Sequence, residues 1–129
     1  MAAPQVSIVP LDSAPDAAAW RVRWRVTNTG STELRLVRVL APHGRFRATD
    51  RAVNQLIAPQ ATAELAAEVA FTEPPGAEVE NAFLILIARC DAREWRILAR
   101  LRVGADANGA PRPLTERIDV QEVGFSGSG

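Results

Sequence analysis

Residues 20–28 read WRVRWRVTN. Large apolar side chains occupy every second position of this stretch, and the positions between them hold arginine or threonine. Successive side chains of a β-strand point to opposite faces of a sheet, so the alternation predicts a half-buried strand. Four residues of one parity are expected to face the core: Trp20, Val22, Trp24 and Val26.

Turn signals and further apolar stretches extend this pattern along the chain. Glycine, proline and asparagine mark turns at residues 28–31, 42–44 and 73–76. Between such turns, strands are predicted at residues 5–10, 34–42, 81–90 and 94–103, with a brief one at 55–58. Residues 46–54 are expected to form a short irregular strand or a loop.

Two segments fit more than one type of element. Residues 61–71 alternate as a strand does, but they are rich in the helix formers Ala, Glu and Leu. Strand is favoured because the segment lies between strands at hairpin spacing. In residues 114–123, Ile118 and Val120 fit a strand, whereas Leu114, Ile118 and Gln121 fit one face of a helix.

The chain length favours one domain. Its 129 residues and 13.9 kDa suffice for a single hydrophobic core and are too few for two. About seven strands with regularly spaced turns are typical of a β-sandwich. We expect the sandwich in residues 1–103, followed within the same domain by residues 104–129 as a linker, a C-terminal arm and a flexible tail that begins at Phe125.

The turn at the end of the first stretch carries a family resemblance. Trp24 to Gly30 reads WRVTNTG, and a strand and later a hydrophobic hairpin follow it. This pattern resembles bacterial immunoglobulin-like domains of the CARDB type, in which a strand often ends in an Asn-x-Gly turn. The resemblance implies an immunoglobulin-like β-sandwich that serves as a binding or spacer module, with no catalytic residues to carry over.

The amino-acid composition bears on which partners the protein could bind and on the cell compartment in which it works. Fifteen basic residues balance fifteen acidic ones, so no net field draws the protein to nucleic acid or to an anionic membrane. All the basic residues are arginine, which suggests a GC-rich bacterial genome. Cys90 is the only cysteine, and neither a signal peptide nor an 18-residue apolar run occurs. We therefore expect a soluble, cytoplasmic protein.

No enzyme site is expected. His43 is the only histidine, and no nucleophile motif accompanies it. One Cys and one His do not make a zinc site, and Glu78 and Glu80 lack the spacing of a calcium loop. No metal, cofactor or small-molecule substrate is predicted. The alternative is a small enzyme or ligand carrier with a loop site around His43, Arg45 and Arg47.

Two rows of arginines suggest a third hypothesis. Arg21, Arg23 and Arg25 form one row, and Arg96, Arg100 and Arg102 form the other. If their strands shared a sheet, the rows could merge with Arg45 and Arg47 into a stripe that binds nucleic acid. The simpler interpretation, which we favour, is a solvated face with cross-strand pairs to glutamates: Glu33, Glu64, Glu68 and Glu94.

The apolar hairpin of residues 81–103 supplies the candidate site. We expect Phe83, Ile85 and Ile87 to face the core with Trp95, Ile97 and Leu101. Three leucines, Leu84, Leu86 and Leu98, would then form an apolar outer face beside Ala88. Such a face is normally covered, either by the arm of residues 114–123 or by a protein partner or second copy. The leading hypothesis is thus a non-enzymatic interaction or assembly module.

Overall fold

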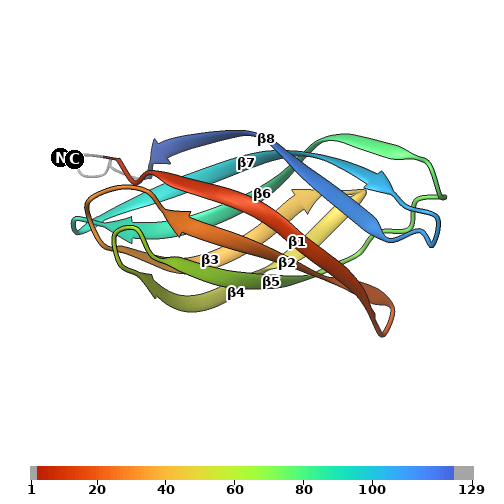
Figure 1. Cartoon of the computed structure of the whole chain (residues 1–129), viewed down its shortest axis with the longest axis horizontal. Coiled ribbons are helices and arrows are strands. Elements are labelled where there is room, and N and C mark those ends of the chain that lie inside the picture. The colour runs from red at the N-terminus through yellow and green to blue at the C-terminus, as the bar shows by residue number, and fades with distance from the viewer. Residues whose placement is uncertain (1–2, 124–129) are drawn as a thin grey trace.

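A computed structural model describes residues 3–123, which form eight β-strands and no helix (Figure 1). The strands are β1 (Val6–Asp16), β2 (Ala19–Asn28), β3 (Leu34–His43), β4 (Phe46–Ile57), β5 (Thr62–Val69), β6 (Glu78–Cys90), β7 (Arg93–Ala105) and β8 (Pro111–Glu122). The predicted all-β sandwich is confirmed, with one strand more than expected. The described residues contain no helix that could span a membrane.

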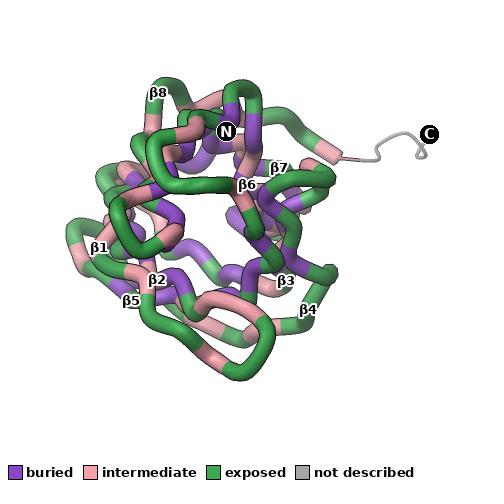
Figure 2. The backbone as a smooth tube through the Cα atoms, turned by 90° about the vertical axis from the view of Figure 1, so that its right-hand side faces the viewer, coloured by how far each residue is buried: buried purple, intermediate pink, exposed green. Residues whose placement is uncertain are grey.

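The strands form two antiparallel sheets. One has the order β1-β2-β5 and the other β4-β3-β6-β7-β8. Figure 2 looks at the molecule from its end and shows the buried residues gathered where the sheets face each other. The larger sheet curves, so that β8 contacts β1 at one side and β4 contacts β5 at the other.

The alternation in β2 sets the inner face of the smaller sheet. Val22, Trp24 and Val26 are 0% exposed, as predicted. The rings of Trp24 and of Phe46 in β4 pack edge to face, with their centroids 6.3 Å apart, and this contact joins the two sheets. Trp20 is half-buried, and its indole Nε1 donates a hydrogen bond to the Phe71 carbonyl oxygen over 3.2 Å.

Residues 62–69 form a strand, as favoured, because their apolar parity matches that of β2. Ala63, Leu65, Ala67 and Val69 are buried opposite the inward residues of β2. Residues 46–57, in contrast, form the single long strand β4 and not an irregular segment followed by a short strand.

The expected C-terminal arm is a strand. β8 pairs with β7 along most of its length and forms an edge of the larger sheet. Its Ile118 and Val120 pack against the core. The sandwich therefore does not end at residue 103, and the linker is confined to the short connection between Ala105 and Pro111. The tail expected from Phe125 lies outside the described residues.

Candidate interaction surface

The register of the β6–β7 hairpin decides which residues face outward. Cys90 pairs with Arg93, so the turn contains only Asp91 and Ala92. Both have positive φ, 55° and 61°, as the tight two-residue hairpin turns require. Leu84, Leu86 and Ala88 therefore lie opposite Ala99, Ile97 and Trp95 on the inner face.

The prediction that Leu84 and Leu86 form an outer face is wrong. Both are 0% exposed, and Ala88 is buried with them. The predicted strands at residues 81–90 and 94–103 leave three residues between them, whereas Arg93 belongs to β7 and pairs with Cys90. One turn residue more or fewer reverses the parity of one strand relative to the other. Leu98 does lie on the outer face, opposite Ile85.

The outer face of the larger sheet nevertheless carries a cluster of apolar side chains. Leu40 lies opposite Ile85, and Ile85 lies opposite Leu98, so three neighbouring strands contribute one aliphatic residue each. Two further residues of β6 share this face. We call the half-buried set the outer patch: Leu40, Phe83, Ile85, Ile87 and Leu98.

Arginines border the outer patch on both sides. Arg38 and Arg96 flank Ile87, and Arg100 lies opposite Phe83. Arg38 pairs with Asp50, and Arg100 lies 3.6 Å from a carboxylate oxygen of Glu116. Arg96 has no acidic partner within residues 3–123. Two of the three border arginines are thus paired with carboxylates, and Arg96 brings a positive charge, unpaired within the described residues, to the edge of the apolar centre.

β8 does not cover the outer patch. It extends the sheet beside β7 and places Asp119 opposite Leu98. Because its apolar residues Ile118 and Val120 face the core, β8 offers the outer face only polar side chains next to the patch. The expectation that residues 114–123 cover this face is therefore wrong.

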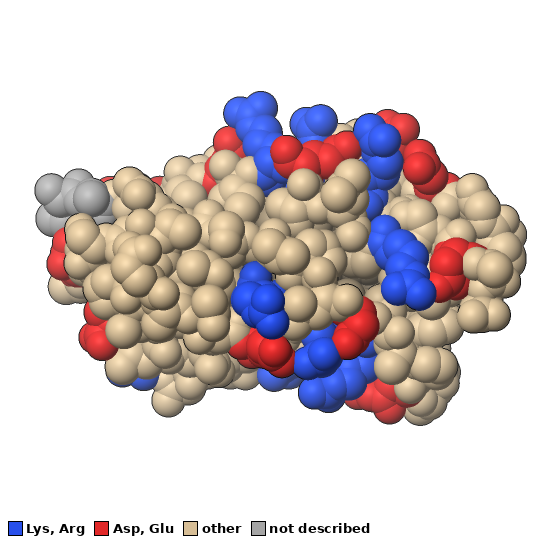
Figure 3. Space-filling model, in the orientation of Figure 1, with Lys and Arg blue, Asp and Glu red and all other residues tan. Residues whose placement is uncertain are grey.

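The two arginine rows lie on different sheets. Arg21, Arg23 and Arg25 belong to β2, whereas Arg96, Arg100 and Arg102 belong to β7. They cannot merge into the stripe that the nucleic-acid hypothesis needs. Figure 3 shows arginines and acidic residues side by side on the face it presents.

The β2 row is largely neutralised by carboxylates. The Arg23 guanidinium donates to both carboxylate oxygens of Asp12, at 2.8 and 2.6 Å, and to Glu64 at 2.7 Å. These contacts lower the pKa of Asp12 and raise that of Arg23, with the Arg23–Asp12 hydrogen bond as the main cause. The solvated face with cross-strand pairs, favoured from the sequence, describes this row.

The loop around His43 holds its side chains in local contacts. His43 Nδ1 accepts a hydrogen bond from the backbone N–H of Arg45 over 3.0 Å. Arg45 in turn binds the Glu73 carboxylate, and this hydrogen bond lowers the pKa of Glu73. Arg47 lies on β4 and exchanges backbone hydrogen bonds with Ala70. The structure thus does not bring these three side chains together around a shared cavity.

Cys90 is buried, with 3% of its surface exposed, as a small apolar residue would be. Burial raises the pKa of its thiol. It lines a small hollow of about 230 Å³ next to the Asn28–Thr32 turn. Within the described part of the chain, no three His, Cys, Asp or Glu side chains are grouped so that they could hold a metal ion.

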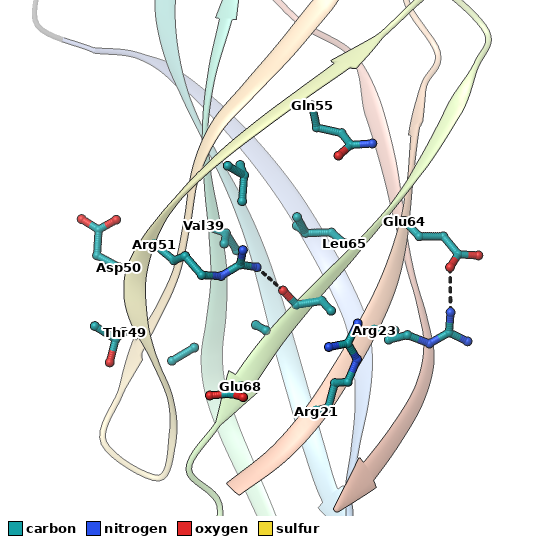
Figure 4. A pocket seen from close by; sticks show the side chains of 14 residues that line it. Arg21, Arg23, Val39, Thr49, Asp50, Arg51, Gln55, Glu64, Leu65 and Glu68 are labelled. Atoms are coloured by element: carbon teal, nitrogen blue, oxygen red, sulfur yellow. Dashed lines mark hydrogen bonds and ion pairs between the residues drawn. The ribbon is translucent and has the colours of Figure 1, made fainter. Parts of the chain in front are cut away.

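A larger groove lies between β4 and β5, where the two sheets meet (Figure 4). Its volume is about 770 Å³. Apolar residues such as Val39 and Leu65 form the floor, and charged residues of both signs form the walls. No local pattern in the residues indicates this groove, since it lies between strands that are not hairpin partners.

Comparisons with known proteins do not assign a function. No protein-family model matches the chain, and no curated protein matches it.

Proposed function

We propose that this chain is a non-enzymatic, immunoglobulin-like interaction module that binds an acidic, partly apolar surface of another protein through its outer patch. The observation that carries the proposal is the aliphatic row Leu40, Ile85 and Leu98 across three adjacent strands. Covering the exposed remainder of side chains of this size contributes on the order of 1 kcal/mol each. Apolar centres with arginines around them are typical of protein interfaces.

The order of the strands supports the immunoglobulin-like assignment. β1, β2 and β5 occupy the places of strands A, B and E, and β4, β3, β6 and β7 those of C′, C, F and G. β8 is an additional strand beside G. Sandwich domains of this kind commonly act by presenting surfaces to partners, although a shared fold alone does not assign a function.

Charge favours a different protein over a second copy as the partner. A two-fold dimer through the outer patch would bring a second unpaired Arg96 to the same interface, which costs free energy unless a carboxylate intervenes. Arg96 is available for a partner carboxylate. We therefore expect the bound surface to carry Asp or Glu around an apolar centre.

The cellular setting is part of the proposal. A bacterial origin is supported by the exclusive use of arginine among the basic residues. A cytoplasmic location is supported by the single cysteine, whose buried thiol has no partner for a disulfide within the chain.

The test begins with a photo-crosslinking residue at position 98, which identifies the bound protein in cells. The purified partner is then titrated with Ile85→Asp and Leu98→Asp variants and with Val9→Asp as the matched control. Val9 is 49% exposed on β1 of the other sheet. We expect each patch variant to weaken binding about 100-fold, or on the order of 3 kcal/mol, and the control to bind normally.

Two results would refute the proposal. One is a partner that binds both patch variants as tightly as it binds the unmodified chain, provided that both variants are folded. The other is a stable dimer in light scattering that the patch variants dissociate, since it would make the second copy the occupant of the outer patch.

A further inference from the structure

The edge of β5 that faces away from β2 presents unpaired backbone groups. The Asn28 N–H donates to the Ala61 carbonyl over 3.0 Å. In an antiparallel ladder, directly opposed residues alternate between pairs that exchange backbone hydrogen bonds and pairs that do not. Counting in steps of two from Ala61, the residues of β5 that bond to β2 are Ala63, Leu65, Ala67 and Val69. The N–H and C=O groups of the intervening residues, Glu64, Ala66 and Glu68, must then point to the free edge.

Two contacts confirm this alternation independently. Ala70, two residues beyond Glu68, exchanges both backbone hydrogen bonds with Arg47 of β4, at 2.8 and 3.2 Å. The carbonyl oxygen of Ala66 accepts a hydrogen bond from the Arg51 guanidinium, which reaches across the groove from β4 (Figure 4). The edge of β5 is thus paired with β4 at one end, and in its middle the Arg51 side chain occupies one carbonyl oxygen.

β4 diverges from β5 beyond the Arg47–Ala70 bridge. Between Leu36 and Arg38, β3 advances two residues while β4 advances three, from Gln55 to Ala52. The same mismatch occurs between Val39 and Ala41. Each extra residue in β4 forms a β-bulge, and a β-bulge bends the strand that contains it. The groove of about 770 Å³ is the space that opens between the two edges.

We propose that this groove binds an extended segment of a partner protein, which adds to the free edge of β5 as a fourth strand of the smaller sheet. Strand addition supplies backbone hydrogen bonds to the open edge, and side-chain pockets supply specificity. The site lies on a different part of the sandwich from the outer patch, so it is a second surface beyond the proposed function.

The walls and floor of the groove define the chemistry of the segment. Side chains of one parity would point between the sheets, where Val39, Leu65 and Ala67 leave room for small or β-branched apolar residues. Side chains of the other parity would lie beside Glu68, on the outer surface. The volume is within the range of about 300–1,000 Å³ that is usual for ligand clefts.

A basic residue on the outward parity fits the local charges. Glu68 lies beside Asp16, and the two carboxyl groups interact closely enough for Asp16 to raise the pKa of Glu68. The positive charges of Arg21, which lies opposite Glu68 on β2, and of Arg51 both act on Glu68, and Arg51 has to leave Ala66 before a strand can bind. A lysine or arginine of the incoming segment would replace the charge of Arg51.

The direct test titrates the full chain with a synthetic peptide that alternates valine with lysine between terminal threonines, acetylated and amidated at its ends. Hydrogen exchange of the backbone amides of Glu64, Ala66 and Glu68 is followed by NMR. We expect saturable binding that slows these three amides by about tenfold or more near saturation. Amides on the opposite edge of the sheet, in β1, serve as the internal reference.

Matched peptides and chain variants distinguish strand addition from binding that does not use backbone hydrogen bonds at the β5 edge. A peptide with glutamate in place of lysine should bind about tenfold more weakly, and one N-methylated on the edge-facing amides should not bind. Ala66→Pro removes an edge N–H that β2 does not use, and it should abolish binding. Arg51→Ala, which uncovers the Ala66 carbonyl, should strengthen binding.

The proposal is overturned if the N-methylated peptide protects the amides as well as the parent peptide, if no peptide of the series binds, or if the β5 edge pairs with a second copy in solution. Leu98→Asp, on the other sheet, should bind the peptide normally. Loss of partner binding through the outer patch and loss of peptide binding in the groove are therefore distinguishable.

Discussion

Asn28 is the one polar residue that is buried within the described part of the chain, with 1% of its surface exposed. Its Nδ2 donates to the carbonyl oxygens of Thr32 and Ile57, at 2.9 and 3.0 Å, and its Oδ1 accepts from the Gly30 N–H at 3.0 Å. The side chain thus satisfies its hydrogen bonds and ties the β2–β3 turn to the end of β4. It therefore connects the two sheets.

Replacement of Asn28 with Ala should lower the free energy of unfolding by about 2–3 kcal/mol, because two carbonyl groups would lose their hydrogen-bond donor. Urea denaturation measures the change. Asn54→Ala is the control, since Asn54 is exposed and its side chain accepts a hydrogen bond from the exposed Arg35. We expect that variant to change stability by less than about 0.5 kcal/mol. Equal effects of the two substitutions would contradict the linking role of Asn28.

Glu68 makes the stability depend on pH. The hydrogen bond and negative charge of Asp16 raise its pKa above the ordinary value of 4.5. Because the folded state favours the protonated carboxyl, this group stabilises the fold fully below pH 4.5 and loses that contribution as the pH rises through the raised pKa. Near pH 7 the carboxylate pair is a source of repulsion.

Glu68→Gln should therefore melt at a higher temperature than the unmodified chain near pH 7, and the difference should shrink as the pH falls below 4.5. Thermal unfolding across this range gives both values. Glu64→Gln is the comparison, because Glu64 forms ion pairs with Arg23 and Arg25 and should gain nothing at neutral pH. A constant difference between Glu68→Gln and the unmodified chain at all pH values would argue against the Asp16 contact.

At the scale of elements, the length of the β6–β7 turn determines which side chains of β6 face the core and which face outward. Ile85 and Leu86 are neighbours in sequence, yet Ile85 lies in the outer patch and Leu86 is 0% exposed between the sheets. Both residues belong to an apolar run in which neither parity is polar. The two-residue turn fixes which parity of β6 lies on the same face as the buried residues of β7, and that parity faces the core.

Aspartate substitution at these adjacent positions should give opposite results. Leu86→Asp buries a charge without a partner, so we expect the chain to be unfolded or aggregated. Ile85→Asp should keep the β-sheet circular dichroism spectrum and a cooperative melting transition. A folded Leu86→Asp variant beside an unfolded Ile85→Asp variant would reverse the assignment of the faces.

At the scale of the whole molecule, β8 completes the sandwich. Its side chains Ile118 and Val120 pack against the core, and the Ser13 hydroxyl of β1 donates to the Pro111 carbonyl over 2.6 Å. β8 therefore joins the edge of the larger sheet to the smaller sheet. Its removal would expose apolar core and a new strand edge on β7 at the same time.

Truncation after Gly109 should lower the melting temperature by about 10 °C or more, because two partly buried aliphatic side chains contribute on the order of 2–4 kcal/mol. It should also cause association in light scattering behind a sizing column. Truncation after Val123 retains β8 and is the control. A monomeric, fully stable chain without residues 110–129 would show that β8 is dispensable.

The sequence alone determined the features that depend on local periodicity. The alternation of residues 20–28 predicts the inward tryptophans, and glycine, proline and asparagine mark the turns, because both signals are contained within a few neighbouring residues. The β-sandwich follows from the number and spacing of such strands. Charge balance and the lack of recognisable site motifs also come directly from the residues.

Only the tertiary structure decided which faces and edges are available to a partner. The outer patch depends on the register that the Asp91–Ala92 turn sets between β6 and β7, and the groove depends on β4 and β5, which follow each other in the chain but belong to different sheets. The two arginine rows are likewise separated by the order of the strands. These features depend on the register between strands and on which sheet each strand joins, and a local pattern specifies neither.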